Sequence, residues 1–215
     1  RLVMREVIRR NLVADGLVYM QMTRGVAPRD HVFPKNVDTA VVVTARRKKP
    51  PPAELLEKGA KAIGIPDIRW ARCDIKSVSL LPNVLGKQPA MEAGAYEAFQ
   101  IDREGYVTEG TATNAWIVTA KDELVTRSAG PEILNGITRL AVIEIAKGQG
   151  LRFVERSFTL ADAKAAREAF VTGSTAFVMP IVQIDDATVG NGKPGALTRA
   201  LRQAYIDRIA GQNAA

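Results

Sequence analysis

Hydrophobic and polar residues follow two different periods along the chain, and this predicts a mixture of helices and strands. Apolar residues three or four positions apart are typical of amphipathic helices, and short β-branched runs between turns are typical of strands. The expected helices cover residues 2–12, 53–64, 83–93, 138–149, 160–166 and 195–209. The expected strands cover residues 17–23, 38–45, 95–102, 106–108, 114–119, 123–126, 151–155, 169–172, 178–184 and 187–189. Because strands and helices mix without regular alternation, an α+β fold is favoured over a doubly wound α/β fold.

The clearest break in this pattern lies between residues 46 and 52. Four consecutive basic residues run directly into three prolines there, and proline runs stop helices and strands. We therefore expect a linker at residues 50–52, between residues 1–49 and residues 53–215. The chain opens at Arg1 on a helical pattern with no initiator methionine and no capping residue, so we expect that further residues precede it.

Composition and charge narrow the class of protein. With 47% hydrophobic and 25% charged residues, the 215-residue chain is typical of a globular protein. Its net charge of +7 is scattered, and its one basic cluster, residues 46–49, has no aromatic residues among it. A solvated linker is therefore favoured over a nucleic-acid site. No apolar run reaches the length of a membrane span, so we expect no membrane partner.

The counts of cysteine and histidine argue against an intrachain disulfide and against a metal site. The only cysteine, Cys73, cannot form an intrachain disulfide, which favours a reducing, cytoplasmic location. Cys73 lies in an apolar stretch, where a buried, inert thiol is commoner than a nucleophile. With one histidine and one cysteine, no pair has metal-ligand spacing, so we expect no metal.

Lys76 is the main candidate for covalent chemistry. It lies in the segment RWARCDIKS and is followed by apolar residues at positions 78, 80 and 81. Burial among such residues would favour a neutral, nucleophilic amine, as a Schiff-base lysine requires. Taken alone the signal is weak, because most lysines are surface residues.

Glu109 is a candidate partner for a cationic ring. It lies in the segment TEGTATN, 33 positions after Lys76. A carboxylate beside the pyridine nitrogen of pyridoxal 5'-phosphate would keep that nitrogen protonated, so that the ring draws electrons from a substrate Cα. The alternative is a surface turn glutamate, which is the commoner fate of glutamate beside glycine.

Two segments could bind a phosphate. Residues 134–139, LNGITR, lead into a predicted helix, so that Gly136, backbone amides and the Thr138 hydroxyl would lie at a helix N-terminus. Residues 172–175, TGST, follow a predicted strand and offer a second set of amides and hydroxyls. Each signal alone is weak, since a threonine after glycine is common at helix starts.

Arg29 and His31 share a polar loop and could together bind a carboxylate. The arginine would use its two-pronged guanidinium and the histidine a single hydrogen bond. A single loop histidine is more often simply solvated.

These segments together resemble the class IV, or fold-type IV, pyridoxal-phosphate aminotransferases, and within them the members that act on D-amino acids. The match runs in family order across nearly the whole chain. It implies a two-domain fold in which residues 1–49 end a small N-terminal domain, mostly absent from this chain, and residues 53–215 form the large cofactor-binding domain.

The resemblance also implies roles for these residues. Lys76 would form the internal aldimine with pyridoxal 5'-phosphate and move the substrate proton, and Glu109 would pair with the pyridine nitrogen. Arg29 and His31 would bind the substrate carboxylate from the neighbouring subunit of a homodimer. Arg69 would lie near the phenolic oxygen and Leu134 behind the ring, and the phosphate would be bound by Gly136, Ile137, Thr138 and Ser174.

The implied reaction is transamination between a D-amino acid and a 2-oxo acid, both small-molecule partners. Branched-chain aminotransferases, amine transaminases and aminodeoxychorismate lyases share the fold and stay open as alternatives, as does an inactive truncated fragment that binds the cofactor. Two features depart from the family. The family's phosphate-binding arginine and substrate-facing tyrosine precede residue 1, and Ala176-Phe177 stands where relatives often carry a small polar or acidic residue.

Overall fold

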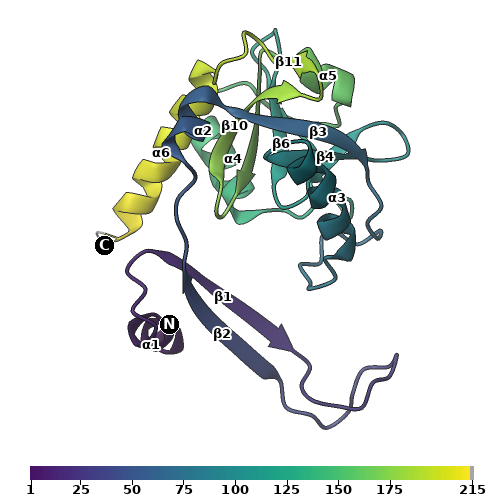
Figure 1. The fold of residues 1–215 in the computed structure, drawn as a ribbon, viewed down its shortest axis with the longest axis vertical. Coiled ribbons are helices and arrows are strands. Elements are labelled where there is room, and N and C mark those ends of the chain that lie inside the picture. The colour runs from purple at the N-terminus through teal and green to yellow at the C-terminus, as the bar shows by residue number, and fades with distance from the viewer. Residues whose placement is uncertain (214–215) are drawn as a thin grey trace. The chain divides into compact units, whose positions relative to one another are not determined.

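A computed structural model describes residues 1–213, and the chain divides into two compact units, Arg1–Pro50 and Pro51–Ala215 (Figure 1). The first unit contains helix α1 (Leu2–Arg10) and an antiparallel pair, β1 (Gly16–Thr23) and β2 (Ala40–Arg47). The predicted second strand ended at residue 45, but β2 continues to Arg47, which pairs with Gly16. A Cβ at Gly16 would lie 2.2 Å from the Arg46 carbonyl oxygen, so glycine permits this close pairing.

The second unit is built on a mixed sheet whose strands follow the order β5-β4-β3-β10-β9-β6-β7-β8, with β11 paired to β10. Strand β3 pairs in parallel with both β4 and β10, and β7 pairs in parallel with β8. The other strand pairs are antiparallel. This irregular mixture confirms the α+β prediction. The strands are β3 (Ala60–Pro66), β4 (Glu97–Ile101), β5 (Val107–Gly110), β6 (Asn114–Val118), β7 (Leu124–Thr126), β8 (Phe153–Glu155), β9 (Glu168–Gly173), β10 (Phe177–Ile184) and β11 (Ala187–Thr188).

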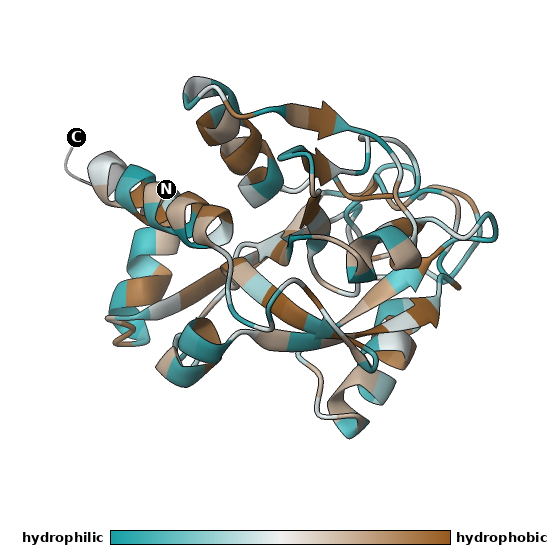
Figure 2. Cartoon of the chain, turned by 90° about the horizontal axis from the view of Figure 1, so that it is seen from above, coloured by the Kyte–Doolittle hydropathy of each residue, from teal (hydrophilic) through white to brown (hydrophobic). Residues whose placement is uncertain are grey.

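Five helices among the described residues of this unit accompany the sheet, and they carry both hydrophilic and hydrophobic residues, as amphipathic helices do (Figure 2). They are α2 (Ala53–Lys58), α3 (Leu81–Glu92), α4 (Ile137–Gly148), α5 (Leu160–Lys164) and α6 (Ala196–Asn213). Within residues 1–213, none of the helices combines the length and apolar character needed to cross a bilayer.

The prediction of a helix over residues 53–64 is wrong in its second half. Helix α2 ends at Lys58, and residues 60–66 form β3, between β4 and β10. Gly59 has a φ of +83° and a Cβ there would lie 2.3 Å from Val182 Cγ1, so the chain turns at a position where only glycine fits. The sequence predicts a helix through residue 64 because β3 is mostly apolar and shows no clear period of two.

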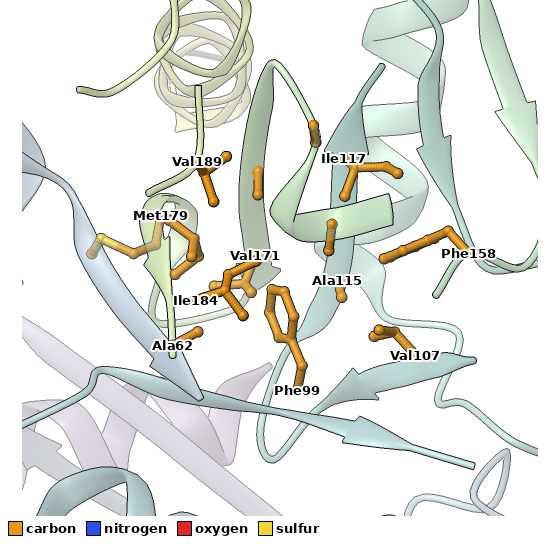
Figure 3. Close-up of a cluster of buried hydrophobic side chains, with 14 of the residues drawn as sticks. Ala62, Phe99, Val107, Ala115, Ile117, Phe158, Val171, Met179, Ile184 and Val189 are labelled. Atoms are coloured by element: carbon orange, nitrogen blue, oxygen red, sulfur yellow. The ribbon is translucent and has the colours of Figure 1, made fainter. Parts of the chain in front are cut away.

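The core of the second unit lies on both faces of the sheet. On one face, Phe99, Ile117 and Val171 belong to a cluster contributed by β4, β6, β9 and β10 (Figure 3). On the other, Trp116 stacks on Phe170 with ring centroids 5.5 Å apart, in a cluster that includes residues of α4 and α6. Neighbouring residues of β6 therefore serve opposite layers, as strand geometry requires. This arrangement fixes the loops at the strand ends.

Candidate active site

The second unit contains a cavity of about 660 Å³. Its walls come from the loop after β3, helix α3, the end of β5 and the loop after it, the loop before α4, and the turn between β9 and β10. The structure therefore brings together all the cofactor-site residues predicted within this unit. The predicted residues that line the cavity are Arg69, Lys76, Glu109, Leu134, Gly136, Ile137, Thr138 and Ser174.

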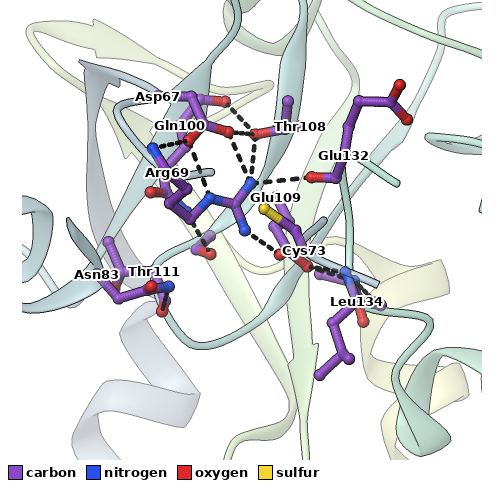
Figure 4. Close-up of polar contacts among 12 residues, drawn as sticks. Asp67, Arg69, Cys73, Asn83, Gln100, Thr108, Glu109, Thr111, Glu132 and Leu134 are labelled. Atoms are coloured by element: carbon purple, nitrogen blue, oxygen red, sulfur yellow. Dashed lines mark hydrogen bonds and ion pairs between the residues drawn. The ribbon is translucent and has the colours of Figure 1, made fainter. Parts of the chain in front are cut away.

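Glu109 is a buried carboxylate whose two oxygens have different donors (Figure 4). Arg69 Nη1 contacts Oε1, while Asn114 Nδ2 and the Leu134 N–H donate to Oε2 at 3.0 and 3.1 Å. Burial raises the pKa of Glu109 to about 7, against the lowering effects of Arg69 and of the Leu134 N–H. Glu109 is therefore a carboxyl whose charge near neutral pH responds to what binds beside it.

Asp67 holds Arg69 from the side opposite Glu109. Arg69 Nε and Nη2 donate to the two Asp67 oxygens at 2.9 and 2.7 Å, and the Thr108 hydroxyl donates to Asp67 at 2.7 Å. Burial tends to raise the pKa of Asp67, but Arg69 and Thr108 together hold it below its usual value. Burial likewise opposes the charge of Arg69, yet its two carboxylate neighbours raise the pKa of the guanidinium overall. Asp67 thus stays ionised and fixes the guanidinium.

Glu97 supports the loop that follows Glu109. Its buried carboxylate accepts from the Thr111 N–H at 3.2 Å and the Thr113 hydroxyl at 2.9 Å, and it contacts the Thr111 hydroxyl. Lys87 Nζ lies 3.3 Å from the same carboxylate. These bonds shape the Gly110–Thr113 loop, which lines the cavity.

Three residues of this site, Asp67, Asn114 and Glu97, are not indicated by any motif in the sequence. Asn114 lies five residues after Glu109, and a side-chain amide can donate to a carboxylate, but this spacing alone does not indicate that it does. Asp67 precedes Arg69 by two residues, a spacing that permits the observed pair but does not demand it. Glu97 gives no local signal, because it reaches its partners only through the pairing of β4 with β5.

The segment before α4 approaches Asn114 closely. A Cβ at Gly136 would lie 2.4 Å from Asn114 Oδ1, so any larger residue would displace the Asn114 side chain. The first turn of α4 has free N–H groups and contains no acidic side chain, and Thr138 within it is buried. Together with Gly173 and Ser174 of the β9–β10 turn, this segment offers amide and hydroxyl donors suited to an anion.

The donor set fits pyridoxal 5'-phosphate. One wall of the cavity holds a buried carboxyl suited to a cationic ring nitrogen, and two other segments hold donors suited to a phosphate. Leu134 also lines the cavity and adds an apolar side chain to these polar groups. Among residues 1–213, no group of three metal-ligating side chains occurs.

Lys76 is exposed in the structure, whereas the sequence predicts that it is buried. The apolar residues expected to bury it are themselves exposed: Ile75 by 45%, Val78 by 62% and Leu80 by 53%. Lys76 is exposed as well, at the wall of the cavity. The expectation of burial is wrong because residues 74–80 form an irregular loop that packs few side chains into the core. The covalent role of Lys76 stays a prediction.

Arg29 and His31 lie in the first unit, in the loop between β1 and β2, and both are exposed. The His31 N–H donates to Asp30 Oδ1 at 2.6 Å, and at the base of the same loop Arg24 lies 3.8 Å from the Phe33 ring centroid. The predicted role of Arg29 and His31 in binding a carboxylate is therefore compatible with their exposure, and it stays a prediction.

Comparison with known proteins identifies the family. A profile described as amino-transferase class IV matches residues 2–184. The chain belongs to the class IV aminotransferases. A D-alanine aminotransferase of Bacillus licheniformis is 39% identical over 211 residues, which cover 98% of this chain and 74% of that protein.

Solved structures of class IV aminotransferases share the fold. The branched-chain amino acid aminotransferase of Escherichia coli has a TM-score of 0.84 at 27% identity, covering 95% of this chain and 69% of that one. The branched-chain enzyme of Thermobaculum terrenum, solved in its pyridoxal-phosphate form, has a TM-score of 0.76 at 26% identity, covering 90% and 64%. The predicted fold-type IV architecture is confirmed.

Proposed function

We propose that this aminotransferase transfers an amino group between a D-amino acid and a 2-oxo acid, with pyridoxal 5'-phosphate bound in the cavity of the second unit. The observation that carries the proposal is the convergence of Lys76, Glu109 and two anion-binding segments on that one cavity. The similarity to D-alanine aminotransferase, at 39% identity, supports the choice of a D-amino acid.

Each residue has a distinct task in this proposal. When bound, the cofactor supplies an electron sink for the substrate Cα. Lys76 Nζ anchors the cofactor covalently and then takes the Cα proton. The Glu109 carboxylate holds a proton on the ring nitrogen. The pKa of Glu109, about 7 in the cofactor-free protein, would fall beside that cation, so a cofactor that binds with its ring nitrogen already protonated would displace the Glu109 proton into solvent near neutral pH.

Arg69 acts on Glu109 in this proposal. All its nitrogens already have protein acceptors, namely Asp67, Glu109, Thr108 and the Glu132 carbonyl oxygen. Arg69 therefore fixes the orientation of Glu109 from within the wall of the cavity. The predicted contact of Arg69 with the phenolic oxygen would use the remaining N–H of Nη1.

A direct test compares the wild-type protein with the Lys76→Ala variant. We expect the wild type to take up pyridoxal 5'-phosphate with a long-wavelength absorbance band and to convert D-alanine and 2-oxoglutarate. The variant should lose both the band and turnover, while Lys61→Ala, at an exposed lysine of β3, keeps them. A variant at Lys76 that retained band and turnover would refute the assignment.

Substrate choice is tested with two amino donors. The solved neighbours described above are branched-chain aminotransferases, at 26–27% identity, so L-leucine is the specific competitor. We expect D-alanine to be preferred, and activity on L-leucine alone would overturn the D-amino acid proposal in favour of a branched-chain enzyme.

The homodimer and the cytoplasmic location also belong to this proposal. If Arg29 and His31 serve the site of a neighbouring subunit, an inactive Lys76→Ala chain can supply Arg29 to an Arg29→Ala chain that keeps its lysine. Equal mixing after subunit exchange should then restore about a quarter of wild-type activity, because half of the dimers are mixed and one of their two sites is complete. No recovery on mixing would argue that Arg29 acts within its own chain.

A further inference from the structure

The turn between β9 and β10 contains a residue in an unfavourable backbone conformation. Phe177 has a φ of +58°, a left-handed value that bulky residues rarely adopt. The same turn carries Gly173 and Ser174, which line the cavity. A conformation of this kind persists only where the surrounding structure holds it, so the contacts of Phe177 and its neighbours indicate what fixes the turn.

Arg202 of α6 binds the backbone on both sides of Phe177. Its Nη1 donates to the carbonyl oxygens of Ala176 and Val178, at 3.0 and 2.8 Å. The guanidinium carbon also lies 5.7 Å from the centroid of the Phe177 ring. Because Ala176 and Val178 are buried, these carbonyl groups depend on protein donors. A single side chain therefore fixes both peptide groups around the left-handed residue.

Tyr205 lies one turn further along α6 and joins the turn to the other anion-binding segment. Its ring packs edge-on against Phe177, with centroids 5.5 Å apart. Its hydroxyl lies 3.3 Å from Thr138 Oγ1, in the first turn of α4. Thr138 is buried, at 2% exposure, so its hydroxyl depends on protein groups such as the Tyr205 hydroxyl and not on bulk water. Residues three apart share one face of a helix, so this face of α6 contacts both segments.

We propose that Arg202 and Tyr205 are positioning residues that hold the two anion-binding segments, residues 136–138 and 173–175, in one fixed geometry. This inference rests on the proposed function in so far as the anion is the phosphate of pyridoxal 5'-phosphate. The two side chains lie behind the donors and act through Thr138 and the Phe177 turn, because neither of them lines the cavity. Fixed donors bind an anion better than mobile ones, since less freedom is lost on binding.

The conservative variants Tyr205→Phe and Arg202→Lys test this role. Tyr205→Phe keeps the ring against Phe177 and removes only the hydroxyl link to Thr138. Gln203→Ala, at an exposed position of the same helix, is the matched control. Each protein is titrated with pyridoxal 5'-phosphate and with pyridoxal, which lacks the phosphate.

If Arg202 and Tyr205 position the phosphate donors, their variants should lose affinity for pyridoxal 5'-phosphate but not for pyridoxal. We expect both variants to bind pyridoxal 5'-phosphate about three- to ten-fold more weakly, the effect of one lost hydrogen bond of ordinary strength. Their affinity for pyridoxal should stay as in the wild type and in Gln203→Ala. Equal weakening toward both ligands would indicate general damage to the fold and overturn the proposal, as would unchanged binding of both.

Amide hydrogen exchange of the cofactor-free protein separates this inference from the proposed function. Tyr205→Phe should speed exchange at Leu140, whose N–H bonds to the Gly136 carbonyl oxygen at the start of α4, and Arg202→Lys should speed it at residues 176–178, with no change in Gln203→Ala. Unchanged exchange in both variants would refute the positioning role. If the wild-type protein did not bind pyridoxal 5'-phosphate, the proposed function would fail, whereas the exchange result would still decide whether α6 fixes the two segments.

Discussion

Replacing Glu109 by glutamine tests which of two opposing effects controls the charge of the site. Burial disfavours the carboxylate, whereas Arg69, Asn114 and the Leu134 N–H all donate to it. Burial prevails and raises the pKa of Glu109 from 4.5 to about 7. Glutamine has nearly the same shape as the protonated carboxyl and does not titrate, so the variant isolates the titration of this one group.

The magnitude and its sign follow from the linkage between proton binding and folding. The unfolded chain loses the Glu109 proton near pH 4.5, while the folded chain keeps it up to about pH 7. The folded state binds more protons in this window, so the stabilisation is complete below pH 4.5 and is lost as the pH rises through 7. At about 1.4 kcal/mol for each pH unit, the loss amounts to about 3 kcal/mol.

The measurement is urea unfolding of the cofactor-free proteins at several pH values between 4 and 8. Trp70 and Trp116 both belong to the second unit, so their fluorescence reports its unfolding. Relative to the wild type, Glu109→Gln should gain about 3 kcal/mol of stability between pH 4.5 and 7.5. The altered contact with Arg69 also changes the free energy of unfolding, but by the same amount at every pH, so it does not affect the pH dependence of the difference.

The opposite trend would refute the reasoning. If the wild type gained stability over the variant as the pH rose, the donors around Glu109 would outweigh its burial, and the folded pKa would lie below 4.5. A flat difference would mean that the two effects cancel. In either case the proton release that we expect on cofactor binding near neutral pH would also be absent.

Three further substitutions, two of them with a matched control, follow from the same geometry. Asp67→Asn breaks a buried ion pair and should lower the free energy of unfolding, measured in urea, by about 3–5 kcal/mol. The control Asp74→Asn, in an exposed ion pair, should change that free energy by less than about 1 kcal/mol. Gly136→Ala should weaken pyridoxal 5'-phosphate binding about ten-fold in a spectroscopic titration because its Cβ would lie 2.4 Å from a neighbouring amide oxygen. Gly148→Ala, in the same helix with no atom within 4 Å, should leave binding unchanged and stabilise by about 0.5–1 kcal/mol. Lys76→Ala should abolish turnover yet alter stability by less than about 0.5 kcal/mol, because the side chain is exposed; a large loss of stability would mean that Lys76 has a structural role.

The sequence predicted the elements of the second unit well where the pattern was long and periodic. Helices α4 and α6 lie close to their predicted bounds, and α3 forms despite Pro89 within it. The failure at residues 60–66 has a physical origin. A strand buried within a sheet shows little alternation, and its identity depends on neighbours that are distant in the chain.

Local sequence segments indicate which residues belong to the candidate site. They do not indicate how deeply each side chain is buried or which groups it contacts. Burial of Lys76 was inferred from its apolar neighbours, but apolar residues in a loop need not reach the core, and here they remain exposed. Glu109, which read as a possible surface turn, is buried with three donors. Two of these donors, on Arg69 and Leu134, lie 40 and 25 positions from Glu109 in the sequence, so no local pattern indicates the pKa of the carboxyl.

The contrast between Glu109 and Lys76 has a consequence for how the site works. Glu109 is held by donors that are themselves fixed, since Arg69 is bound by Asp67 and Asn114 also donates to the Leu134 carbonyl oxygen at 2.7 Å. Such preorganised groups need little rearrangement when charge develops on a bound ring. Lys76 is exposed, so in the proposed function its amine would be free to exchange one covalent partner for another during each turnover. The fixed carboxylate and the exposed lysine therefore suit two tasks that each half of the proposed transamination requires, which are to stabilise charge and to move a proton.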